Sequence, residues 1–406
     1  MPLQPMSSTT ALDGIRVIDV TQVMAGPFCT MVLADLGADV IKIEPPGGDM
    51  TRRMPGGVGA DTPAYNAVNR GKRSVVLDLK RAEGREAVLR LACRADVFVE
   101  NSRPGAMAAL GLDYGALAAV NPGLIYASIS GFGQTGPDRA RGGLDLIAQG
   151  VSGIMSVTGD PDGPPMKSGV PLTDLAAALF VVTGILAALV HRTRTGAGQH
   201  VDTALVDAGV ALSVWEATEY FAGAGVPGPL GSAHRMVAPY QAIRCADGFI
   251  TIGASTDRLF ERLCEVLGHP EWARMAEFAD NPSRVRHRGA LADRIESVTA
   301  ARPRRHWLEA LQAAEVPAGP INRYDEVFTD PQVLAREMVV DVEHPTLGRI
   351  RTLGSPVKLS HTPPRVDRRA PLLGEHTAAV LREAGFDEAA IARLQGRGSA
   401  PRDSAD

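Results

Sequence analysis

Residues 15–44 read IRVIDVTQVMAGPFCTMVLADLGADVIKIE and contain two short apolar runs on either side of a helical run. Ile15–Val20 and Val40–Glu44 are rich in β-branched side chains, whereas Phe28–Leu36 carries its apolar residues at helical spacing. A strand, a helix and a second strand in this order predict a βαβ unit, in which the helix joins two parallel strands.

The same alternation continues along the chain to about residue 130. Strands are expected at Arg73–Leu79, Val97–Glu100 and Leu124–Ser130, and a helix is expected over Glu83–Arg94. The pattern therefore predicts an α/β fold with a parallel sheet. Ligands of such sheets bind beyond the carboxyl ends of the strands, so the loops that follow these strands are the first candidate sites.

The middle of the chain predicts a second, smaller domain. Residues 1–222 form the large domain in this interpretation, and the Gly- and Pro-rich segment Ala222–Gly231 is the linker. Residues 223–330 contain a hairpin signal at Ala246–Gly248 and helical runs beyond it, which indicate an α+β domain. Residues 331–406 add short strands and a helix, and their polar tail from residue 396 is expected to be disordered.

Composition excludes several classes of function. The net charge of −4 gives no basic excess for a nucleic acid or an anionic membrane. The four cysteines are scattered and no histidine pair has metal-ligand spacing, so neither disulfides nor a metal site is expected. Leu175–Val190 is apolar over sixteen residues, too short for a membrane span, and is expected to be a buried core helix. With no secretory signal at Met1–Asp13, we expect a soluble, cytoplasmic protein.

A glycine motif follows the strand at Leu124–Ser130. Gly131–Gly136 matches the spacing of a dinucleotide-binding loop, but Pro137 and a further glycine-rich stretch follow where that motif needs a helix. A nicotinamide or flavin is therefore not expected. The glycines more simply let the loop pass close to a ligand or to a second chain.

The charged residues beside the expected strands and helices each have two possible roles. Asp174 or Thr173 is placed to cap the apolar helix that follows, but a sheltered, ionised carboxylate is also a suitable nucleophile toward an acyl group. Arg70, Lys72 and Arg73 precede the third strand; they suit phosphate binding or a solvated rim. The residues alone leave these alternatives open.

Many motifs in one order resemble the class III CoA-transferases, the family of formyl-CoA transferase and carnitine CoA-transferase. The matching segments run from about Leu12 to Leu394 and are Leu12–Asp19, Ala25–Pro27, Leu33–Glu44, Asn69–Ser74, Val99–Gly105, Ser130–Gln134, Arg192–Asp202 and Pro371–Thr377. The resemblance implies a Rossmann-like large domain assembled from both chain ends, a small domain, and a homodimer of interlocked subunits.

The resemblance also implies roles for individual residues. The family's nucleophilic aspartate falls on Asp174, and an assisting acidic residue falls on Asp145. The CoA-contacting positions, with Arg73 added from its charge, are Met24, Ala25, Arg73, Leu77, Lys80, Asn101, Ser102, Arg103 and Arg141. CoA would be a substrate rather than a permanently bound cofactor.

Two further segments indicate the class of substrate. His234–Gln241 and Gly319–Asn322 are similar to the succinyl-CoA:dicarboxylate branch, and His234 and Arg235 are candidates for binding the far carboxylate of a dicarboxylate acceptor. The expected reaction moves CoA from an acyl-CoA to a free carboxylic acid through an aspartyl-CoA thioester. The alternative is a 2-methylacyl-CoA racemase, whose histidine base is replaced here by Leu144.

Overall fold

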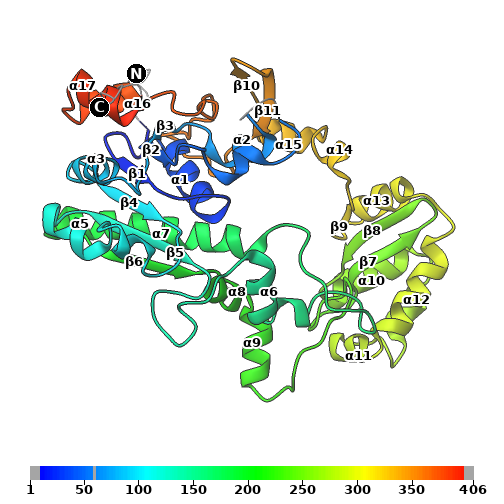
Figure 1. Ribbon diagram of the computed structural model, residues 1–406. Coiled ribbons are helices and arrows are strands. Elements are labelled where there is room, and N and C mark those ends of the chain that lie inside the picture. The colour runs from blue at the N-terminus through cyan, green and yellow to red at the C-terminus, as the bar shows by residue number, and fades with distance from the viewer. Residues whose placement is uncertain (1–9, 58–60, 397–406) are drawn as a thin grey trace, which may run out of the picture. The chain divides into compact units, whose positions relative to one another are not determined.

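The computed structural model describes residues 10–57 and 61–396, which divide into two compact units (Figure 1). Unit 1 contains the chain up to Ile154, Ser168–Ala217 and the chain from Pro331, and unit 2 contains Met155–Lys167 and Thr218–Asp330. The Gly- and Pro-rich segment expected as a linker therefore lies inside unit 2. No sequence pattern indicated that Met155–Lys167 leaves unit 1; a hydrogen bond from Gly231 N to Gly159 O, 2.8 Å long, ties it to unit 2.

Unit 1 is built on a parallel sheet, as the alternating pattern predicted. Its six strands are β1 (Arg16–Asp19), β2 (Asp39–Glu44), β3 (Arg73–Val76), β4 (Val97–Glu100), β5 (Ile125–Ser130) and β6 (His200–Ala204). Their order is β3-β2-β1-β4-β5-β6 and every pair is parallel. The order reverses between β1 and β4, which is the place where open α/β sheets bind their ligands.

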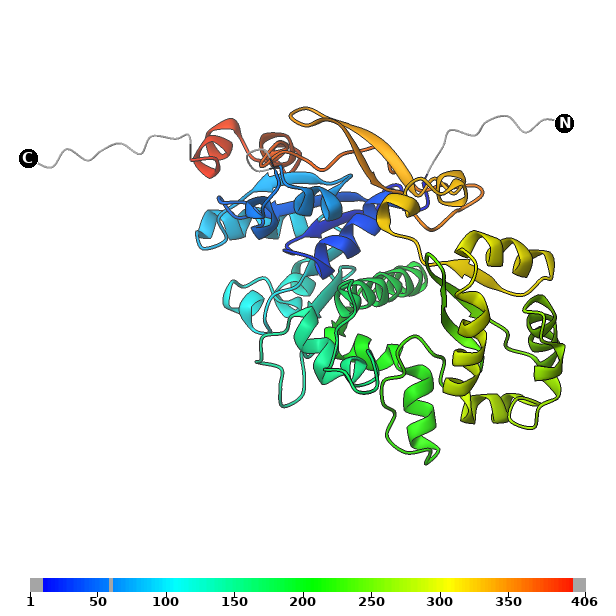
Figure 2. The same cartoon turned by 90° about the vertical axis from the view of Figure 1, so that its right-hand side faces the viewer.

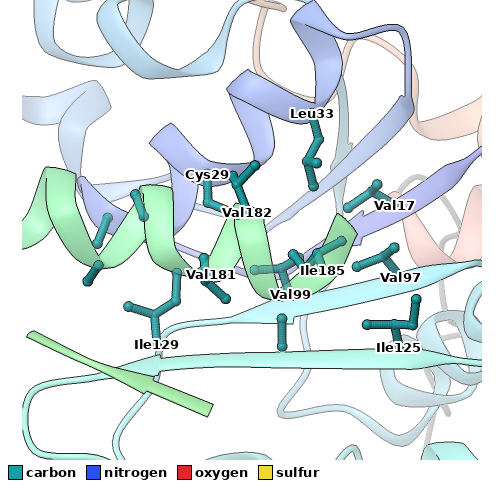
Figure 3. Packing of buried hydrophobic residues seen from close by; sticks show 14 of the residues in the cluster. Val17, Cys29, Leu33, Val97, Val99, Ile125, Ile129, Val181, Val182 and Ile185 are labelled. Atoms are coloured by element: carbon teal, nitrogen blue, oxygen red, sulfur yellow. The ribbon is translucent and has the colours of Figure 1, made fainter. Parts of the chain in front are cut away.

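Helices cover both faces of this sheet. The helices that follow or join its strands are α1 (Ala25–Asp35), α2 (Pro63–Asn69), α3 (Ala82–Ala92), α4 (Ala106–Ala109), α5 (Tyr114–Val120), α6 (Asp145–Val151), α7 (Leu172–Thr195), α8 (Leu205–Leu212) and α9 (Val214–Phe221), with 3-10 turns at Met50–Arg53 and Ile154–Ser156. Apolar residues of α1, α7 and α8 pack on one face, as Figure 3 shows for Leu33, Val181 and Ile185. Residues of α3 and α5 pack on the other face.

Helix α7 is the longest of the described helices and lies beside α1, as the long green helix in Figure 2 shows. By length and composition it could cross a membrane, yet 44% of its most apolar window is buried within the protein. Packing against the sheet accounts for that share. The expectation of a buried core helix is confirmed for one side of α7, where Val181 and Ile185 join the core, whereas Leu179, Phe180 and Val190 on the other side are exposed.

The C-terminal part of the chain returns to unit 1. It forms α15 (Pro331–Ala335), the antiparallel pair β10 (Val339–His344) and β11 (Gly348–Leu353), α16 (Thr377–Glu383) and α17 (Glu388–Leu394). Thr377 Oγ1 accepts a hydrogen bond from Val76 N of β3 at 3.0 Å, and Val380, Leu381 and Ile391 join the core on the α3 face. Helix α16, drawn in red in Figure 1, accordingly lies beside β3. Most of the tail expected to be disordered, residues 397–406, lies outside the described residues.

Unit 2 is a small α+β structure. Its antiparallel sheet contains β7 (Tyr240–Cys245), β8 (Gly248–Gly253) and β9 (Ala318–Pro320), and its helices are α10 (Asp257–Val266), α11 (Asn281–Arg286), α12 (Arg288–Thr299), α13 (Arg304–Ala313) and α14 (Tyr324–Val327), with a 3-10 turn at Pro270–Arg274. Cys245 pairs with Gly248, which confirms the hairpin predicted there.

Candidate active site

The loops after β1 and β4 meet where the strand order reverses, at what we call the carboxyl edge, the side on which all six strands end. Met24 and Ala25 begin α1 after β1, and Asn101–Arg103 follow β4. The Asn101 side chain joins the two loops: its Oδ1 accepts from Gln22 N at 2.9 Å and its Nδ2 donates to Gln22 O at 2.8 Å. Sequence reasoning gave Asn101 a ligand contact and missed this clasp.

The β1 loop also holds an uncommon backbone conformation. Val23 has φ of +70°, a region that β-branched residues avoid because Cβ approaches the carbonyl oxygen. Such strain persists only where the surroundings fix it, and it is frequent at functional sites. The hydrogen bonds from Asn101 hold the preceding residue Gln22, and Val23 N itself donates to Asp49 Oδ1 at 3.4 Å.

The loop after β3 brings Lys80 to the same edge, and a cavity lies beside this loop. Leu77 is buried in the core, with 1% of its surface exposed, so its backbone is the part that faces the edge. Lys80 follows in the loop and is exposed. A cavity of about 580 Å³ lies beside this loop, lined among others by Val76, Asp78 and Arg81.

The loop after β5 folds back on itself, and this brings α6 to the carboxyl edge. A Cβ on Gly131 would come within 2.5 Å of Gly143 Cα, so glycine is required for the two backbones to approach this closely. Gly131 therefore packs against Gly143 of the same loop, whereas a Cβ on Gly136 would meet nothing within 4 Å; the expectation that the loop passes a ligand or a second chain stays a prediction. Gly133 N and Gln134 N already donate to Ser130 Oγ and Asp202 Oδ2, both at 3.0 Å.

Arg141 of this loop lies close to Arg103 of the β4 loop. Arg141 is exposed, pairs with Asp138 at 2.8 Å and lies 4.6 Å above the Phe132 ring. The guanidinium of Arg103 lies beside Gly142, the next residue along, where a Cβ would be 3.1 Å from its Nη2. The arginines from the β4 and β5 loops are thus neighbours.

Asp174 lies in the first turn of α7 beside Asp145, the first residue of α6. The link between the two helices is Thr173, whose N and Oγ1 donate to Asp145 Oδ1 at 3.0 and 2.8 Å. Helix α7 begins at Leu172 after Pro171 with no side-chain cap, so the expected capping by Asp174 or Thr173 was wrong. Pro171 places the helix start earlier, which leaves the Thr173 side chain for Asp145.

The environment of Asp174 makes its carboxyl group hold its proton more tightly. Burial raises its pKa from 3.8 to about 6, and the charge of Asp145 adds to the rise. At neutral pH the carboxylate is still mainly ionised, but it is poorly solvated. A carboxylate with few waters and a negative neighbour is a stronger nucleophile than a solvated one.

Three basic residues, for which the sequence left phosphate binding and a solvated rim open, are held in ion pairs. Arg73 is the first residue of β3, at the edge of the sheet opposite the carboxyl edge, and pairs with Asp39 at 2.6 Å and with Glu383 at 2.8 Å. Arg70 and Lys72 are buried in ion pairs with Asp35 at 2.6 Å and Asp19 at 3.0 Å. Buried charges need such partners, so these side chains serve the fold.

His234 and Arg235 lie in unit 2, in the segment before β7. Arg235 Nη2 donates to Gly228 O at 2.7 Å, and its Nε lies 3.6 Å from Glu219 Oε2. His234 Nδ1 accepts from Met236 N at 3.1 Å. Within residues 10–57 and 61–396, no group of three His, Cys, Asp or Glu side chains could hold a metal ion.

The chain resembles known proteins over most of its length. The sequence is 44% identical over 380 residues to the succinate–glutarate CoA-transferase of Agrobacterium fabrum, covering 92% of this chain and 95% of that protein. It is 45% identical to the succinyl-CoA:mesaconate CoA-transferase of Haloarcula hispanica, covering 92% and 96%. The crystal structure of a CAIB/BAIF family protein from Brucella suis matches with a TM-score of 0.84 and 42% identity, covering 92% and 99%.

The profile of one protein family extends over most of the chain. CoA-transferase family III matches residues 12–377, a range that includes the carboxyl edge, Asp145 and Asp174. The chain belongs to CoA-transferase family III, and it is an enzyme that transfers coenzyme A.

Proposed function

We propose that this enzyme moves CoA from succinyl-CoA to a free dicarboxylate through a thioester between CoA and Asp174. The observation that carries the proposal is Asp174 itself, a poorly solvated carboxylate held beside Asp145 at the carboxyl edge. The relatives named for succinyl-CoA and dicarboxylates support the choice of substrates.

The steps follow from carboxylate and thiolate exchange. Asp174 attacks the thioester carbonyl, the C–S bond breaks, and CoA thiolate leaves as a mixed anhydride forms. The thiolate then attacks the carbonyl carbon of Asp174, which releases the donor acid and leaves an aspartyl-CoA thioester. The acceptor carboxylate repeats both steps in reverse and departs as its CoA ester, and Asp174 is regenerated. One thioester replaces another, so no ATP is needed, but the anhydride must be kept from water.

The carboxyl edge offers contacts for the CoA portion. Lys80, Arg103 and Arg141 are exposed cations on three neighbouring loops and suit the phosphates, since arginine binds phosphate as a planar fork. Met24, Ala25, Leu77, Asn101 and Ser102 lie on the loops along the same edge and would line the rest of CoA. His234 and Arg235 stay our candidates for the far carboxylate of the acceptor; Arg235 would have to exchange its present partners for it.

We also propose that two copies interlock as a homodimer, in the cytoplasm. Exposed apolar side chains gather on α6 to α9 of this chain, including Leu146, Phe180, Val210 and Trp215. A surface of this kind on a soluble protein marks an interface. Light scattering should therefore give twice the chain mass, and Phe180→Asp should lower it; a monomeric wild type would overturn this part of the proposal.

Mass spectrometry tests the covalent step directly. Mixing the enzyme with succinyl-CoA and no acceptor should place a CoA-sized adduct on the peptide that contains Asp174, and Asp174→Ala should fold but form none. An adduct on another residue would overturn the mechanism. The racemase alternative is less favoured, because Leu144 stands at the position of its histidine base; it would exchange the α-hydrogen of an acyl-CoA with deuterated water without any acceptor.

A further inference from the structure

A glutamine in α6 is fully buried and has both ends of its side-chain amide in use. Gln149 Nε2 donates to Asp145 Oδ2 at 2.8 Å, and Gln149 Oε1 accepts from Ser168 N at 2.8 Å. Ser168 is the residue at which the chain re-enters unit 1 and leads into α7. One amide therefore joins the assisting carboxylate to the chain that carries the nucleophile.

Thr173 completes the enclosure of Asp145 from the other side. Thr173 is fully buried, and its two donors occupy Asp145 Oδ1 while Gln149 occupies Oδ2. The position of the Asp145 carboxylate is thus fixed by three hydrogen bonds from two helices. Hydrogen bonds to a charged group are stronger and more directional than neutral ones.

We propose that Gln149 is a positioning residue for CoA transfer, which fixes the Asp145 carboxylate beside Asp174 and, through Ser168, fixes the start of α7. The inference rests on the proposed function of Asp174. Neither bond could be predicted from the pattern of α6, where Gln149 is simply one turn beyond Asp145.

The electrostatics explain why this position matters. The charge that acts on Asp174 is that of Asp145, and the interaction between two charges changes steeply over an ångström at short range. On the neighbouring α8, Asp207 has a pKa raised by burial and by Asp202, so it forms a separate acidic pair. If Gln149 releases Asp145, the carboxylate can turn away from Asp174, and Asp174 becomes easier to ionise.

Exchange of the two polar groups provides a sharp test. Gln149→Met keeps the length of the side chain and removes both hydrogen bonds. In Asp145→Asn the two Thr173 donors keep the side-chain oxygen facing Thr173. The amide NH₂ of the new asparagine then faces the Nε2–H of Gln149, so two donors oppose each other. The double variant Asp145→Asn with Gln149→Glu restores an acceptor both for the amide introduced at position 145 and for Ser168 N, and it moves the negative charge from position 145, where it acts on Asp174, to position 149.

The readout is the pH at which adduct formation on Asp174 is half-maximal. We expect this midpoint to be highest in the wild type, lower in the double variant and lowest in Asp145→Asn. Gln149→Met should also lower it and reduce kcat about tenfold or more, with KM for the CoA ester changed by less than about threefold. Asn69→Leu is the control, because it removes another fully buried amide with two partners, Tyr65 O and Lys72 Nζ, and should leave the midpoint unchanged.

The outcomes separate this inference from the proposed function. An adduct that forms in the wild type and in Gln149→Met with the same midpoint and kcat would overturn the positioning role alone. No adduct in the wild type would overturn the proposed function and this inference with it. If Gln149→Met fails to fold, the double variant decides: restored folding with an unmoved midpoint would also overturn the inference.

Discussion

Replacing Asp174 by asparagine should make the protein more stable at neutral pH while it abolishes the adduct. The substitution keeps the shape of the side chain and removes a charge that the folded protein solvates poorly. Burial and the charge of Asp145 raise the pKa of Asp174 from 3.8 to about 6. The folded state therefore bears a cost for ionising this group that the unfolded chain does not bear.

The size of the effect follows from the pKa values. A rise from 3.8 to about 6 corresponds to about 3 kcal/mol, at about 1.4 kcal/mol for each pKa unit. Asp174 keeps part of its surface in contact with water, which screens the charge, so a gain of about 1 to 2 kcal/mol is the realistic expectation for the variant.

The pH dependence has a definite sign. Below pH 3.8 the carboxyl is protonated in both states, and the variant gains nothing. Between pH 3.8 and about 6 the unfolded chain releases its proton first, so the stability advantage of the variant grows. Above about pH 6 the folded carboxyl is ionised as well, and the advantage stays constant.

Urea denaturation at pH 4.5, 5.5, 7 and 8 measures this curve for wild type and Asp174→Asn. Asp280→Asn is a control of opposite kind, because hydrogen bonds from Ser283 lower the pKa of Asp280, which is ionised in both states across this range. Its stability difference should be flat between pH 4.5 and 8. A flat difference for Asp174→Asn as well, or a variant less stable than the wild type at pH 7, would refute the reasoning.

The β1 loop gives two more predictions. Asn101→Ala removes both hydrogen bonds to Gln22 and should raise KM for the CoA ester about tenfold. The control Asn121→Ala loses two hydrogen bonds, to Ala92 O and Ala95 O at the other edge of the sheet, and should lower stability by a similar amount while KM stays unchanged. Equal KM values for the two variants would contradict the role given to Asn101. Val23→Gly relieves the strain at φ +70° and should leave the free energy of unfolding, measured with urea, unchanged or raise it by up to about 1 kcal/mol. Met24→Gly, at a residue with φ −128°, should lower the free energy of unfolding. Equal losses in the two variants would argue against strain at Val23.

The local pattern of the sequence was sufficient to predict five of the six strands of the parallel sheet and the β7–β8 hairpin, but not β6. Each βαβ unit repeats a contrast between apolar β runs and helical spacing that a short window contains, as in residues 15–44. The sequence could not predict that Met155–Lys167 belongs to unit 2, because this depends on contacts between residues far apart in the chain, such as that between Gly159 and Gly231.

The site shows the same division between local and distant causes. Asp174 and Asp145 were assigned by resemblance, but the hydrogen bonds between their helices require the folded chain. Arg73 was assigned to CoA from its charge, although it precedes its strand, and the first residue of a parallel strand lies at the edge opposite the carboxyl edge. Buried partners also decide the role of Lys72, whose pKa burial lowers to about 8 beside Asp19.

Residues from the far end of the polypeptide finish the sheet that the first residues begin. His376 N donates to Ser74 O, and Val76 N donates to Thr377 Oγ1. These backbone groups on the outer side of β3 therefore find their hydrogen-bond partners in residues that are synthesised about 300 positions later. During translation these groups stay without their partners, and open to other chains, until the chain has been synthesised past Thr377. A nascent chain arrested before His376 should accordingly be a client for chaperones, however complete its catalytic residues are.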